Sequence, residues 1–146
     1  MTNDDEAGRL LDDAKAFLED HAQRRKTAIG FEWGVGSDRV ALFRNQTPDE
    51  EAGELTELKR WRALVFDAGF GWIAGPRELG GGGLPPAVDR AYDALERQFA
   101  VPSRTLLGVS LGMVAPTIEI HGNDAQKAKW VPELRRGDLV DRKSVV

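Results

Sequence analysis

Apolar residues recur at spacings of three and four over residues 4–26, which places their side chains along one face of a helix. The acidic residues Asp4, Asp5 and Glu6 suit the positive end of the helix dipole, and the basic run 24–26 suits its negative end. The pattern therefore predicts an amphipathic helix, with an inward stripe made of Ala7, Leu10, Leu11, Ala14, Phe17, Leu18 and His21.

A second helix is predicted from Thr47 to about Ala68. Thr47 and Glu50 have the spacing of a capping box, and Pro48 fits the first helical turn. The expected inner stripe consists of Leu55, Leu58, Trp61 or Arg62, Val65 and Ala68. Helical periodicity resumes at Pro86 and ends before Val101-Pro102, with Val88, Ala91, Tyr92, Leu95 and Phe99 facing inward.

Residues 104–120 are apolar nearly all round, which is typical of a buried helix. Asn123 and Gln126 have capping-box spacing for a last helix, which we expect to bend at Pro132 and to end at Gly137. Glycine-rich stretches interrupt the helices at 27–46, predicted as a loop or short hairpin-like excursion, and at 69–86. No segment is a convincing strand. The expected fold is all-α, an orthogonal or up-down bundle of five to six helices.

Composition narrows the class of protein. With 146 residues, the chain has the length of one domain; 41% of its residues are hydrophobic and 30% are charged, as in soluble globular proteins. The net charge of −4 gives no clustered basic face for a nucleic acid. The run 105–118 is too short to span a bilayer. The absence of cysteine excludes disulfides and thiolate chemistry and fits a cytoplasmic location.

No residue pattern specifies a reaction by itself. Residues 108–112 match the G-x-S-x-G pattern of a serine hydrolase, but no strand is predicted before Ser110 and the sequence has only His21 and His121. The glycine run 80–83 lacks the lysine and hydroxyl residue of a phosphate loop and is interpreted as turns. No group of acidic residues and histidines has the spacing of metal ligands.

Three segments, in order, carry a resemblance to a known family. The first is Gly69–Gly81, which contains Pro76-Arg77-Glu78 and Gly80-Gly81. The second is Leu107–Gly112, followed by Pro116-Thr117-Ile118. The third is His121–Asp138, which contains Gly122-Asn123, Gln126-Lys127, Trp130 and Gly137-Asp138. Together they resemble the N-terminal helical domain of acyl-CoA dehydrogenases. The resemblance covers residues 50–140 well and the first helix loosely, so we assign 1–140 to this domain.

The resemblance implies a parent enzyme that performs FAD-dependent α,β-dehydrogenation of an acyl-CoA. A general base removes the proton α to the thioester carbonyl while a hydride leaves the β-carbon for the flavin. The resemblance also implies that the parent enzyme has an electron acceptor as partner and assembles as a homodimer or homotetramer. The helix 105–119 would form a wall of the acyl pocket, with Leu107, Gly108, Leu111 and Gly112 as the contacts; the alternative, that these residues only pack the bundle, stays open.

The chain departs from the family at two places. Residues 27–46 are longer than the usual connection, which suggests a divergent subfamily. Residues 141–146 do not continue the family's next strand; they are consistent with translation of a sequencing-adapter read-through. The expectation is an N-terminal fragment that lacks the flavin loop and the catalytic base, holds no FAD and is inactive alone. The alternative is a stand-alone helical interaction or scaffold module without a cofactor.

Overall fold

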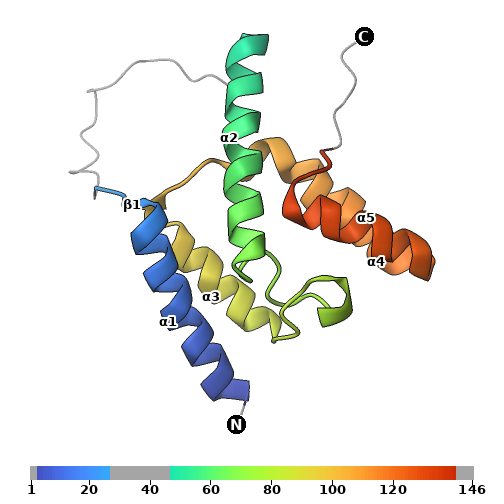
Figure 1. Ribbon diagram of the computed structural model, residues 1–146, viewed down its shortest axis with the longest axis horizontal. Coiled ribbons are helices and arrows are strands. Elements are labelled where there is room, and N and C mark those ends of the chain that lie inside the picture. Colours follow the sequence, from blue (N-terminus) through green and yellow to red (C-terminus); the bar gives the residue numbers. More distant parts are fainter. Residues whose placement is uncertain (1–2, 27–46, 141–146) are drawn as a thin grey trace, which may run out of the picture.

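The computed structural model describes residues 3–26 and 47–140, and helices form most of this part of the chain (Figure 1). The α-helices are α1 (Asn3–His21), α2 (Pro48–Asp67), α3 (Pro86–Glu96), α4 (Ala115–His121) and α5 (Asp124–Arg136). Shorter turns of helix are η1 (Arg77–Leu79), η2 (Arg104–Leu107) and η3 (Ser110–Val114). Two residue pairs, β1 (Gln23–Arg24) and β2 (Phe99–Ala100), form a small antiparallel ribbon. The predicted all-α class is confirmed.

Both predicted capping boxes are present. At the start of α2, the Thr47 hydroxyl accepts from the Glu50 N–H at 3.3 Å, and the Glu50 carboxylate accepts from the Thr47 N–H at 2.9 Å. Asn123 and Gln126 make the same exchange at the start of α5, at 2.8 and 3.0 Å. Gly137 ends α5 in the left-handed conformation, with φ 87°, which glycine adopts without steric cost.

Two predicted helix ends are wrong for the same reason. The helix expected over 4–26 stops at His21, and α3 stops at Glu96 instead of continuing through Phe99. The residues beyond both ends pair with each other: Gln23 lies opposite Ala100 and Arg24 opposite Phe99. This contact joins segments more than 70 residues apart, and such long-range pairing overrides the local helical signal.

The main core lies among α1, α2 and α3, with α1 packed beside α3 (Figure 1). Its fully or nearly buried members are Ala14, Leu18, Val65, Phe70, Ile73, Leu84, Val88, Tyr92 and Phe99. The inner stripe predicted for α2 is confirmed at Leu58, Arg62 and Val65, but Ala68 is exposed because α2 ends at Asp67 before the chain turns away.

The connection between α2 and α3 folds back on itself (Figure 1). The carboxylate of Asp89, on α3, accepts from the backbone N–H groups of Ile73 and Ala74 at 3.3 and 3.0 Å. Within the connection, the N–H of Leu84 donates to the carbonyl of Ile73 at 3.1 Å. These bonds fix the loop against α3, so the glycine run is a packed structural element.

The helices α4 and α5 lie side by side and project from the rest of the bundle near α2 (Figure 1). None of the helices that the structure describes is long and apolar enough to cross a membrane. The predicted loop at 27–46 and the predicted tail at 141–146 lie outside the described residues.

Candidate functional site

Residues 104–121 form one continuous helical segment in which the hydrogen-bond register changes. It begins as the 3-10 turn η2, passes through the π-helical turn η3 and continues as α4. In η3 the N–H of Ala115 donates to the carbonyl of Ser110, five residues earlier. Pro116 follows directly and has no N–H to donate, which accounts for a change of register at this point.

One side of this segment is exposed and uncharged, and we call it the outer face. Its members recur at spacings of three and four; they are Thr105, Gly108, Val109, Gly112, Met113, Thr117 and Ile120. Val109, Met113 and Ile120 are 48%, 65% and 72% exposed. In a chain whose residues are 30% charged, an exposed helix face without a charge is unusual.

The prediction of a fully buried helix over 104–120 is therefore wrong. The opposite side of the segment packs inward, where Leu107, Ser110 and Ala115 have no exposed surface. The sequence pattern places apolar residues on both sides of this helix. It does not tell whether the domain packs against both sides. Here the domain covers only one.

The four predicted acyl contacts do not share one environment. Leu107 is fully buried and packs the bundle, and Leu111 is half-buried. Gly108 and Gly112 lie on the outer face, and a Cβ added to either would meet no atom within 4 Å. Val109 and Met113 were not among the predicted contacts, but they are exposed next to these glycines and share their helical spacing of four.

An apolar groove lies between α4 and α5. Its cavity of about 310 Å³ is lined by Val114, Ile118, Trp130, Leu134, Leu139 and Val140. Trp130 is 36% exposed, and the ammonium group of Lys129 lies 4.3 Å from its ring centroid. Three basic side chains of α5 are engaged in contacts of this kind or in ion pairs: Lys129 with Trp130, Arg135 with Glu119 and Arg136 with Asp67.

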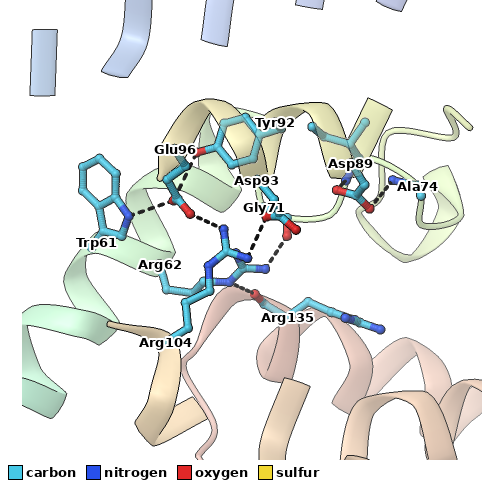
Figure 2. Close-up of polar contacts among 11 residues, drawn as sticks. Trp61, Arg62, Gly71, Ala74, Asp89, Tyr92, Asp93, Glu96, Arg104 and Arg135 are labelled. Atoms are coloured by element: carbon cyan, nitrogen blue, oxygen red, sulfur yellow. Dashed lines mark hydrogen bonds and ion pairs between the residues drawn. The ribbon is translucent and has the colours of Figure 1, made fainter. Parts of the chain in front are cut away.

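A polar network holds the start of the segment (Figure 2). Arg104 binds Asp93 at 2.9 Å and also forms an ion pair with Glu96. Burial lowers the pKa of Arg104, but the carboxylates of Glu96 and Asp93 outweigh burial, so its pKa is raised overall. The side chain of Glu96 is nearly buried, and its second oxygen accepts from Trp61 Nε1 at 3.2 Å and the Tyr92 hydroxyl at 3.4 Å. Burial, followed by the Glu96 charge, raises the pKa of Tyr92.

Arg62 is buried beside this network, and it joins three elements. Its Nε donates to the carbonyl of Arg135 at 2.8 Å and its Nη2 to the carbonyl of Gly71 (Figure 2). Burial, and then the charge of Arg104, lowers its pKa to about 10. The guanidinium therefore ties α2 to the end of α5 and to the turn after α2.

A second ion pair holds the other end of the segment. Glu119, on α4, accepts from Arg135 Nε at 3.0 Å and from its Nη2 at 2.5 Å. The guanidinium of Arg135 also lies 4.6 Å from the ring centroid of Trp72. Both side chains of the pair are mostly buried, at 22% and 15% exposure. Glu119 thereby joins α4 to α5 and to the loop before α3.

The hydrolase pattern at 108–112 does not form a nucleophile elbow. Ser110 is fully buried within a π-helical turn, whereas an elbow presents an exposed serine between a strand and a helix. His21 stacks on Phe17 with ring centroids 4.4 Å apart, and its Nδ1 is 2.9 Å from the Phe17 carbonyl oxygen. Within residues 3–26 and 47–140, no three acidic or histidine residues are grouped to hold a metal.

Comparison with known proteins decides the family. The family model for the acyl-CoA dehydrogenase N-terminal domain matches residues 37–138. This chain belongs to the acyl-CoA dehydrogenase family. The matched range contains the whole segment 104–121, with its outer face and both ion-pair contacts.

A curated member of the acyl-CoA dehydrogenase family gives a more limited match. The chain is 34% identical over 70 residues to acyl-CoA dehydrogenase FadE29 of Mycobacterium tuberculosis. The aligned region is 48% of this chain and 16% of that protein, so the chain spans a minor part of this dehydrogenase's length. No solved structure matches the chain.

Proposed function

We propose that this chain forms a wall of the acyl pocket in an FAD-dependent acyl-CoA dehydrogenase. The observation that carries the proposal is the outer face of residues 104–121. It is uncharged, mostly apolar and exposed within the part of the chain that matches the family's N-terminal domain. Removal of apolar surface from water stabilises a complex by roughly 25 cal/mol per Å², so an acyl chain would gain free energy by covering this face.

The glycines shape the proposed contact surface. Because Gly108 and Gly112 leave open space beside the helix backbone, an acyl chain can approach alongside the side chains of Val109 and Met113. Leu111 borders this strip, and Leu107 supports it from inside the bundle. We therefore assign acyl contact to Gly108, Gly112 and Leu111, extended by Val109 and Met113.

FAD would supply the acceptor for the β-hydride in the parent reaction. The glycine run 80–83 does not fit a phosphate site for it. The glycine run that could resemble a phosphate cradle is filled by the chain itself: a Cβ on Gly81 would lie 2.1 Å from the carbonyl carbon of Gly75, and one on Gly82 would lie 2.7 Å from the Ile73 carbonyl oxygen. We accordingly assign only substrate contact to this domain.

Photoaffinity labelling tests the acyl contact directly. An acyl-CoA with a diazirine near the end of its acyl chain is expected to label residues 108–113 of the purified chain. Competition by unmodified acyl-CoA, but not by free CoA, should remove the label, because the contact is with the acyl group. Met113→Glu should weaken labelling, and Thr56→Glu, an exposed change on α2, is the matched control. Equal competition by free CoA, or labelling spread over the surface, would overturn the proposal.

The competing function is that of a helical interaction module, in which the outer face binds a protein surface. The exposure of Val109, Met113 and Ile120 favours this alternative as well. If acyl-CoA gives no labelling and the chain self-associates through a face that Met113→Glu blocks, the interaction module is the correct function.

A further inference from the structure

Charged groups in residues 104–121 are placed at the two ends of the segment and on its inner side. Arg104 lies at the start of η2, directly before the outer face begins at Thr105. Glu119 lies in α4 beside Ile120, where the outer face ends. Both residues pair with neighbouring helices, so each end of the segment is attached to a different part of the bundle.

We infer that the Arg104–Glu96 and Glu119–Arg135 ion pairs are positioning contacts, which set the height and direction of the outer face relative to the bundle. This inference rests on the proposed function, because it concerns how the acyl-facing surface is presented. In this role Glu96 and Arg135 position the outer face without touching the acyl group themselves.

The contact at the start is built to hold one geometry. Arg104 reaches Asp93 and Glu96, which lie one turn apart on α3, with its two terminal nitrogens. Glu96 cannot turn freely, because Trp61 on α2 and Tyr92 on α3 donate to its other oxygen. A planar guanidinium paired with a fixed carboxylate defines both the distance and the direction of the contact.

The contact at the far end is fixed by a different set of elements. Arg135 uses two nitrogens on one oxygen of Glu119, while its guanidinium plane lies near the Trp72 ring. The backbone carbonyl of the same Arg135 accepts from Arg62 (Figure 2). Through Arg135, these contacts fix the position of α4 relative to α5, to α2 and to the loop before α3.

The middle of the segment needs such attachment. Gly108 and Gly112 have low helix propensity, and the change of register at η3 replaces regular α-helical bonds. A segment with these features holds its direction less firmly by its own backbone. Contacts at both ends supply the restraint from outside.

A distance measurement tests the inference without any ligand. The sequence has no cysteine, so Met113→Cys on the outer face and Ala94→Cys on the exposed side of α3 give two unique labelling positions. With nitroxide labels, pulsed electron paramagnetic resonance reports the distance distribution between them. Glu96→Gln and Glu119→Gln are each expected to shift or broaden this distribution while circular dichroism shows the same helix content.

Two controls separate positioning from general stability. Val88→Ala weakens the core without touching either pair, and Asp67→Asn breaks the ion pair to Arg136 that joins α2 and α5 elsewhere. Both should leave the distance distribution unchanged. Arg104→Lys keeps the charge but cannot bridge two carboxylates with a planar fork, so we expect a partial shift. An unchanged distribution in Glu96→Gln or Glu119→Gln would overturn the role of that ion pair.

The photolabelling experiment distinguishes the two proposals. If the distances shift in the two glutamine variants and acyl-CoA labels the wild-type chain, the variants should label less at 108–113. If the distances shift but the wild type takes no acyl label, the positioning role stands and the acyl-pocket function fails.

Discussion

Gly81→Ala should destabilise this domain strongly, although it adds a single methyl group. The new Cβ would lie 2.1 Å from both the carbonyl carbon and the carbonyl oxygen of Gly75, and 2.5 Å from its Cα. These three nearest atoms all belong to the backbone, so the clash cannot be relieved by moving a flexible side chain. The loop between α2 and α3 must open to admit the methyl group.

The cost follows from what the loop holds together. Opening it removes bonds from Gly82 to Trp72 at 2.9 Å, from Gly83 to Gly75 at 2.8 Å and from Leu84 to Ile73 at 3.1 Å. At about 1 kcal/mol for each bond, the loss is about 3 kcal/mol. Leu84 is 4% exposed, and partial exposure of its side chain adds up to about 2 kcal/mol. We expect the free energy of unfolding to fall by about 3–5 kcal/mol.

Gly53→Ala is the matched control for this change. Gly53 lies within α2, and a Cβ there meets nothing within 4 Å, so alanine should raise the free energy of unfolding by about 0.5–1 kcal/mol. Urea unfolding followed by circular dichroism measures both variants against the wild type. If Gly81→Ala were as stable as the wild type, close backbone packing would not be the reason for glycine at this position.

Three further predictions concern other parts of the structure and the cofactor. Asn123→Ala removes the side-chain cap of α5 and should lower the free energy of unfolding by about 1 kcal/mol, measured by urea denaturation; Asp124→Ala, with no cap bond, is the comparison. The hydrogen bond from Arg136 lowers the pKa of Asp67, so its contribution to stability is present above 3.8, the ordinary pKa, and is lost as the pH falls through the lower, folded-state pKa. Asp67→Asn should flatten this acid-side loss in unfolding measured as a function of pH, and an unchanged profile would contradict it. The purified chain should carry no stoichiometric flavin by visible absorbance; a yellow protein with one flavin per chain would refute that expectation.

Features determined by neighbouring residues could be predicted from the sequence. Each capping box joins two residues three positions apart, so the spacings at Thr47 and Asn123 were sufficient to place the starts of α2 and α5. The left-handed glycine at 137 follows from the same local chemistry. For these elements the bonding partners lie within the segment itself.

Features determined by distant partners could not be predicted. Trp61 and Glu96 are 35 residues apart, and no spacing rule places an indole N–H against that carboxylate. The end of α1 depends in the same way on a distant segment, because the residues that follow it, β1, pair with β2 after the chain has passed through α2 and α3. The helix predicted over 4–26 therefore forms only as far as His21, before the residues that pair with β2.

The predicted acyl contacts lie on different sides of the segment 104–121. The family resemblance implied contacts at Leu107, Gly108, Leu111 and Gly112, but a resemblance in sequence does not tell which side of a helix the domain covers. The packing does: Leu107 and Ser110 are turned inward, while Val109 and Met113 are left in water beside the two glycines. In the same segment the charged side chains of Arg104 and Glu119 are paired against the bundle. Pairing the charges inward while leaving apolar groups outward is unfavourable for a domain surrounded by water. It is favourable once an apolar group covers the face, and for this reason our proposal places the acyl contact on the outer face and not on the buried Leu107.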